Sequence, residues 1–161
     1  MRIAILSDTH SRYQTIEKVL ELLKEQRITF ALHCGDIEDA EAVQLFAGLT
    51  AHFVFGNCDY ERAGLRWAVQ AIGATIHEPY GDLELEGCKI AWIHGDDRRL
   101  FQDLEQSGHY DYLFYGHSHR AEQHRSGPTL VVNPGALHRA KPKTFVVLDL
   151  TEGELQTVEV G

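Results

Sequence analysis

Short apolar segments that alternate with helical segments dominate the first half of the chain. Segment 2–6 (RIAIL) is typical of a strand buried on both faces. Further strands are predicted at 30–34 and 51–55, and helices after residue 11, at 40–47 and near 61–72. Because each strand is followed by a helix, the pattern predicts a parallel α/β layer.

The first helix carries the clearest local signals. Ser11 and Gln14 have the spacing of a capping box, which predicts that the helix starts there. Its apolar residues form one stripe, as expected for a helix packed on a sheet: Ile16, Val19, Leu20 and Leu23.

The second half of the chain has a different order of predicted elements, with more strands and fewer helices. Segment 82–95 predicts a hairpin that turns at Glu86–Gly87, and 98–106 predicts a helix. Strand-like runs follow at 112–115, 129–133, 144–150 and 154–160. We expect antiparallel pairing to dominate here. No linker or repeat interrupts the chain, so residues 1–161 are expected to form a single domain.

Composition excludes several classes of function. The net charge of −9 opposes binding to duplex nucleic acid. No apolar run is long enough to span a membrane, and no signal peptide is evident, so we expect no membrane association. The three cysteines form no disulfide framework and favour a reducing, cytoplasmic setting.

Polar clusters follow five of the apolar runs, each beside a glycine or a turn. They are SDTH, CGDIED, GNCD, IHGDD and GHSH, and they contain Asp8, His10, Asp36, Asn57, His94, His117 and His119. Ligand sites of α/β sheets form where strands end and loops begin. Residues two apart in an extended segment point the same way, so we expect each Asp-x-His or His-x-His pair to face one centre.

These residue types suit a pair of divalent cations. Carboxylates and imidazoles bind manganese, iron or zinc. Two such ions with Asp8, Asp36 and a bridging hydroxide would leave a net charge of roughly +1, which attracts an anionic phosphate ester. Two metals about 4 Å apart can activate water and stabilise displacement at phosphorus.

The ordered motifs Asp-x-His, Gly-Asp, Gly-Asn, a single His and Gly-His-x-His resemble those of the calcineurin-like metallophosphoesterase superfamily. The short length and the SDTH, GNCD and NPGA segments are similar to its small single-domain microbial phosphodiesterases. The resemblance runs from residue 5 to about 135. It implies an α/β fold: a four-layer αββα sandwich of two mixed β-sheets flanked by helices.

The resemblance also implies roles for individual residues. One metal would be held by Asp8, His10, Asp36 and His119. The other would be held by Asp36, Asn57, His94 and His117, with Asp36 bridging, and the expected catalytic residues are Asp36, Asn57 and His94. Arg12 and Cys58 are the expected substrate contacts. Manganese is the expected ion, with iron, zinc, nickel and magnesium as alternatives.

Two positions depart from the pattern of that superfamily. Many members have a histidine directly after the metal-binding asparagine, where this chain has Cys58. Small members often have a second histidine after the His-Gly pair, where this chain has Asp96. General acid catalysis is therefore left open, while diesters with good leaving groups need no protonation by the protein.

At single positions, a purely structural role is an alternative to metal binding. Asp8 and Ser11 alone suit helix caps, and Asn57 alone suits a turn. Glu38, Asp39 and Asp97 are interpreted as solvated loop carboxylates. The remaining histidines are interpreted as surface or core residues: His33, His52, His77, His109, His124 and His138.

Two functions remain as hypotheses. The first is a phosphoesterase, expected to be a phosphodiesterase, in which a hydroxide bridging two divalent ions attacks a small phosphate ester. The alternative is a non-catalytic scaffold, because the resemblance includes a retromer subunit that uses this fold for protein interaction. The oligomeric state stays open, since members of the family are often dimers or larger, and the natural substrate also stays open.

Overall fold

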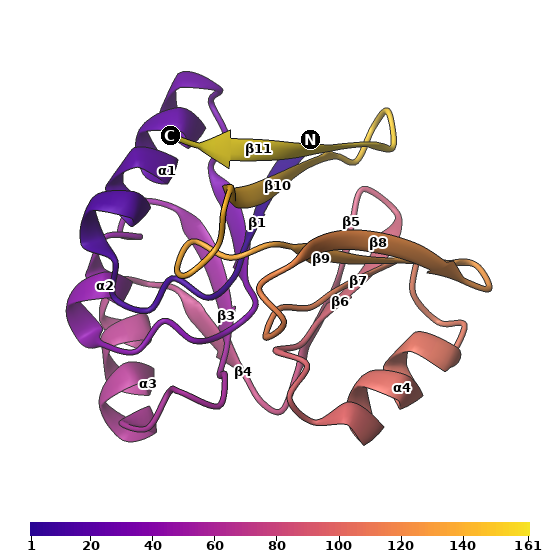
Figure 1. Ribbon diagram of the computed structural model, residues 1–161, viewed down its shortest axis with the longest axis horizontal. Coiled ribbons are helices and arrows are strands. Elements are labelled where there is room, and N and C mark those ends of the chain that lie inside the picture. The colour runs from indigo at the N-terminus through magenta and orange to yellow at the C-terminus, as the bar shows by residue number, and fades with distance from the viewer.

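The computed structural model describes residues 1–161 and contains two mixed β-sheets that lie face to face between helices (Figure 1). The six-stranded sheet has the order β11-β10-β1-β2-β3-β4. Its strands are β1 (Arg2–Leu6), β2 (Phe30–His33), β3 (Thr50–Val54), β4 (Thr75–His77), β10 (Lys143–Asp149) and β11 (Glu154–Val160).

The second sheet has five strands in the order β5-β6-β7-β9-β8. They are β5 (Gly81–Leu85), β6 (Cys88–Trp92), β7 (Tyr112–Phe114), β8 (Ala121–Ser126) and β9 (Thr129–Pro134). Figure 1 shows three helices beside the first sheet and one beside the second: α1 (Tyr13–Glu25), α2 (Ala40–Gln44), α3 (Arg62–Ala71) and α4 (Arg98–Gln106). The expected α/β sandwich of two mixed sheets is confirmed.

Strand β1 shows how the layers are held together. Its side chains alternate between faces, so Ile3 and Ile5 enter the core between the sheets, while Ala4 and Leu6 enter the core beneath α1–α3. The large side chains of Trp92 and Phe114 complete the core between the sheets. A smaller cluster packs α4 against the outer face of the second sheet.

Strand direction determines where the loops meet. Strands β1, β2 and β3 pair in parallel, and so do β6, β7 and β9. The carboxyl ends of parallel neighbours lie at the same edge of a sheet, so the polar clusters that follow these strands converge. The topology thus brings segments from both halves of the chain to one place.

The structure corrects several local expectations. The second half is rich in antiparallel pairs, as expected, but β7 pairs in parallel with both of its neighbours. Ser11 caps no helix: α1 starts after Arg12 without a side-chain cap, and the Ser11 hydroxyl donates to the Ile37 carbonyl. Strands β4 and β8 were not predicted from the sequence. None of the helices has the length and apolar character that crossing a membrane would require.

Gly81 in β5 lies against the face of the Trp92 side chain, and a Cβ at this position would overlap the indole ring. We predict that Gly81→Ala lowers the free energy of unfolding by about 1–3 kcal/mol, because the buried indole has no space to move. Gly64→Ala in α3 is the matched control, since a Cβ there meets open space and alanine favours helix. Urea unfolding of both variants tests this, and equal stabilities would contradict it.

His33, at the end of β2, is 1% exposed and neutral. Its Nδ1 accepts the Gly35 N–H, so Nε2 carries the proton and donates to Thr9 Oγ1 at 3.0 Å. Burial lowers the pKa of His33 from 6.5 to about 4, despite the nearby Asp8 and Asp36.

We predict that this histidine contributes to acid unfolding. Because its pKa is lowered on folding, its contribution is complete above pH 6.5 and is lost as the pH falls toward 4, by up to about 3 kcal/mol. Urea unfolding between pH 4 and 8 should give a flatter pH dependence for His33→Gln than for the unchanged chain. An equal slope in both proteins would contradict the prediction, and exposed His109→Gln is the control.

Candidate metal centre

Backbone hydrogen bonds join the loop after β1 to the loop after β2, and the loop after β6 to the loop after β7. Asp8 N donates to Gly35 O at 3.1 Å, and His10 N donates to Asp36 O at 2.9 Å. Gly116 N donates to His94 O at 2.8 Å. These bonds satisfy backbone groups that lie beyond the sheet ladders, and they fix the loops relative to one another.

The polar side chains converge by a different backbone geometry from the one expected. Asp8, His10, Asp36, His117 and His119 all have positive φ, between 43° and 70°, so none lies in an extended segment. Asp and His tolerate this left-handed conformation better than most residues. The expectation that extended geometry aligns each pair is therefore wrong, although the pairs do face a common region.

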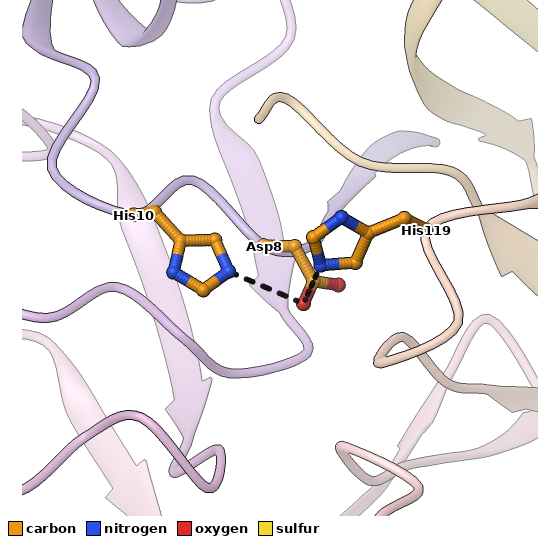
Figure 2. Close-up of side chains that lie close together, drawn as sticks. All are labelled: Asp8, His10 and His119. Atoms are coloured by element: carbon orange, nitrogen blue, oxygen red, sulfur yellow. Dashed lines mark ion pairs between the residues drawn. The ribbon is translucent and has the colours of Figure 1, made fainter. Parts of the chain in front are cut away.

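The first group of candidate ligands surrounds Asp8 (Figure 2). His119 Nε2 lies 3.1 Å from Asp8 Oδ1, and His10 Nε2 lies 3.7 Å from the same oxygen. The two imidazoles approach this carboxylate from different loops, as Figure 2 shows. His10 Nε2 is also 3.5 Å from Asp36 Oδ2.

The second group surrounds Asn57. Its Oδ1 lies 2.8 Å from His94 Nε2 and 3.1 Å from His117 Nδ1. His94 Nε2 is also 3.3 Å from Asp36 Oδ2. One oxygen of Asp36 therefore faces both groups, and the two histidines of the GHSH segment belong to different groups.

Buried carboxylates and histidines shift one another's pKa values. Burial favours a protonated Asp36, but His94, the Cys58 N–H and His10 outweigh it and lower its pKa to about 2. Burial opposes charge on His10, yet Asp8, Glu38 and Asp36 raise its pKa to about 9. The pKa of Asp8 is also lowered: His10, His94 and Ser7 overcome its burial.

Two buried polar atoms at the centre have no hydrogen-bond partner, namely Asp8 Oδ1 and His10 Nε2. Unpaired buried polar atoms are costly, so their position calls for a ligand between them. Three groups of side chains have ligand atoms that lie within 4.8 Å of one another; the ligand atoms are carboxylate oxygens, imidazole nitrogens and, in one group, the Cys58 sulfur. This donor set fits a divalent cation of borderline hardness.

Asp59 holds the loops together from beneath the centre. Its carboxylate accepts N–H bonds from Gly56 at 2.8 Å, Asp36 at 2.9 Å and Glu38 at 2.8 Å, and its side chain is buried. These three donors come from the loops after β2 and β3. Asp59 therefore positions the backbone that carries Asp36 and Asn57.

Glu38 is more than the solvated loop carboxylate expected from sequence. Its Oε1 lies 2.7 Å from His10 Nδ1, so it accepts the Nδ1–H bond and leaves Nε2 free as an acceptor. A carboxylate in this position orients a metal-binding histidine and makes it more basic. Asp39 and Asp97 also have structural roles, since they cap α2 and α4.

An open pocket of about 330 Å³ lies over the centre. Cys58 lines it, as expected, and so do His138 and Arg139. Arg12 lines a different surface depression, and its Nε donates to His138 Nδ1 at 2.9 Å. Arg12, an expected substrate contact, therefore does not line this pocket itself; it contacts His138, which does.

Glycines allow the close approaches that the centre requires. A Cβ at Gly56 would overlap Asp36, and one at Gly116 would overlap Ser7 and Asp8. Asn133, in the NPGA segment, donates to Gly116 O and Ser118 Oγ and so braces the loop that carries both histidines. In the sequence, glycines directly beside the polar clusters indicate that other side chains approach the backbone closely at these positions.

Three residues near the centre were not recognised from sequence in these roles: Glu38, Asp59 and His138. Arg139 was one of four arginines considered as a phosphate contact, with Arg12 preferred. Asp59 directly follows the GNC segment, and this adjacency was the only available signal for it. His138 and Arg139 come from a loop before β10, far along the chain from the other motifs. Only the tertiary fold brings them to the pocket.

Comparison with known proteins gives matches along most of the chain. The family model of the calcineurin-like phosphoesterase superfamily domain matches residues 1–153. The chain is similar to phosphodiesterase MJ0936 of Methanocaldococcus jannaschii, with 30% identity over 138 residues, 84% of this chain and 83% of the relative.

Solved structures show the same fold. An archaeal phosphodiesterase superposes with a TM-score of 0.92 at 27% identity, covering 99% of this chain and all of the other. Vacuolar protein sorting 29 of Cryptosporidium parvum superposes with a TM-score of 0.69 at 19% identity, covering 98% and 95% of the two chains, and shows the fold alone. The match along nearly the whole chain shows that this protein belongs to the calcineurin-like phosphoesterase superfamily.

Proposed function

We propose that this protein is a metal-dependent phosphodiesterase that hydrolyses a small phosphate ester. The observation that carries the proposal is the convergence of seven candidate ligands in two groups that share Asp36. Similarity to an archaeal phosphodiesterase over nearly the whole chain supports the reaction class.

The candidate ligands divide between two ions. Asp8, His10 and His119 would hold one ion, Asn57, His94 and His117 would hold the other, and Asp36 would contact both. When bound, two divalent cations would supply a hydroxide nucleophile at neutral pH and offset negative charge at phosphorus. Manganese is the proposed ion, and the donor set also accepts iron, zinc, nickel or magnesium.

The residues of the chain shape the rest of the reaction. With two ions and one hydroxide, the two carboxylates leave a net charge of roughly +1, which favours a diester monoanion. A bond forms between the water oxygen and phosphorus while the bond to the leaving alcohol breaks. The products are a phosphate monoester, which keeps the hydroxyl derived from water, and the alcohol, whose oxygen takes up the other proton of that water by way of the solvent.

Contacts to the phosphate would come from the pocket over the centre. Arg139 and Cys58 line this pocket and are the proposed substrate contacts. Arg12 would act through His138, whose ring it holds by a hydrogen bond. Since cysteine replaces the histidine found in many relatives, we propose that alcohols of low pKa leave most readily.

We predict metal-dependent hydrolysis of bis(p-nitrophenyl) phosphate. Activity should disappear after chelation, return with Mn²⁺, and fall by more than about 100-fold in Asp36→Asn and His119→Ala, because each removes a ligand. His109→Ala is a control far from the ligand set. Retained activity in both ligand variants would overturn the proposal, and a protein without bound metal or activity would favour a non-catalytic scaffold.

A second prediction concerns Glu38. Glu38→Gln keeps a hydrogen-bond acceptor for His10 Nδ1 but removes the negative charge. We expect about 10-fold weaker Mn²⁺ binding by isothermal titration calorimetry, because the imidazole becomes less basic. Glu41→Gln on the exposed side of α2 is the matched control. Equal affinities in the two variants would show that Glu38 does not act on the metal centre.

A further inference from the structure

A second cavity lies beside the metal centre. It has a volume of about 410 Å³, and His94 forms part of its wall. We call it the lateral pocket. It lies between the loop after β3, the segment before β5 and the first turn of α4, and it includes Phe55, Arg62, Glu78 and Asp96. None of the reaction steps above uses this space.

Two residues, His94 and Arg62, connect the lateral pocket with the candidate ligands. His94 is buried, and its Nε2 faces Asn57 and Asp36. Arg62 donates from Nε to Asp59 O at 3.1 Å and from Nη2 to Gly56 O at 3.3 Å, so it is fixed to the loop that carries Asn57. A molecule in this pocket would therefore lie next to a phosphate at the metal centre.

Apolar groups give the pocket a defined shape. Phe55, Ile93 and Leu100 line it. The guanidinium carbons of Arg62 and Arg66 lie 5.0 and 5.2 Å from the centroid of the Phe55 ring, so both cations pack against this ring. A volume of this size is within the usual range for sites that bind small organic ligands.

Charge determines which ligands the pocket accepts. Three carboxylates and one guanidinium line it, so carboxylates outnumber the cation, and the guanidinium of Arg62 is engaged with two backbone carbonyls of the loop after β3. Glu78 is paired with Arg66 through two hydrogen bonds of 2.8 and 2.6 Å, and Asp97 caps α4. Asp96 is exposed and has no hydrogen-bond partner in the protein. Such a wall accepts hydrogen bonds from hydroxyl or amino groups and repels a second phosphate.

We propose that the lateral pocket binds the retained alcohol of the diester, the one that stays esterified to phosphorus after the leaving alcohol has departed, and that this retained group carries no negative charge. It would combine an apolar body with hydrogen-bond donors, a chemistry that nucleosides represent. This inference depends on the proposed function, because the pocket gains its role only from a phosphate bound next to His94. It also gives Asp96 a role in selecting the substrate.

Three p-nitrophenyl diesters with one common leaving group test the proposal. They are methyl p-nitrophenyl phosphate, thymidine 5′-(p-nitrophenyl phosphate), and the same thymidine ester with a 3′-phosphate. We expect kcat/KM of the manganese-loaded protein to be about tenfold higher for the thymidine ester than for the methyl ester, because binding of a remote group lowers the barrier. The 3′-phosphate should remove this advantage.

Asp96→Lys tests the charge argument. It should raise kcat/KM for the 3′-phosphate ester relative to the 3′-hydroxyl ester by about tenfold. Asp103→Lys, an exposed substitution on α4, which begins shortly after Asp96, lines no described pocket; it is the matched control and should leave that ratio unchanged.

The outcomes separate the two proposals. Equal kcat/KM for the methyl and thymidine esters, or an unchanged ratio in Asp96→Lys, would overturn the lateral pocket as the alcohol site while leaving the hydrolase intact. Absence of metal-dependent p-nitrophenol release from all three esters would overturn the proposed function itself, and the pocket inference with it.

Discussion

Repulsion between two buried carboxylates is the constraint around which this molecule is organised. Oxygens of Asp8 and Asp36 lie within 4.8 Å of each other, and both residues are almost completely buried. Ionised carboxylates at this distance repel strongly when water is excluded. Backbone N–H groups of His117 and Cys58 each donate to one of them, and the surrounding imidazoles supply further compensation.

This requirement explains why the two sheets must meet face to face. His10, on the loop after β1, faces both carboxylates. Further compensation for Asp8 comes from the loop after β7, and for Asp36 from the loops after β3 and β6, so both sheets contribute. The core of apolar side chains between the sheets therefore determines the electrostatics of the centre, because it sets the distance between the loops.

Local patterns were enough to predict much of this arrangement from sequence. Apolar runs identified most strands, and the residue types after them predicted the candidate ligands that the fold brings together. The pattern failed at β8, an edge strand whose segment AEQHRS is almost wholly exposed and has no apolar alternation. It also failed at β4, whose three residues are too few to show a period.

The supporting residues were harder to predict for a different reason. Asp59 acts through backbone N–H groups, which have no sequence signature, and Arg139 reaches the pocket only through the fold. The left-handed turns at the ligands were also missed, since Asp and His adopt such conformations only occasionally. Periodicity describes neighbours along the chain, whereas these contacts depend on distant segments.

The left-handed backbone at Asp8, His10, Asp36, His117 and His119 has a consequence for how such a protein can change. β-Branched and bulky side chains are strongly disfavoured at positive φ, whereas Asp, Asn and His are tolerated. Most sequence changes at these positions would therefore be rejected for conformational reasons before any loss of chemistry mattered. A descendant without metal binding would therefore keep Asp or His at many of these positions, because its backbone conformation requires such residues even when activity does not.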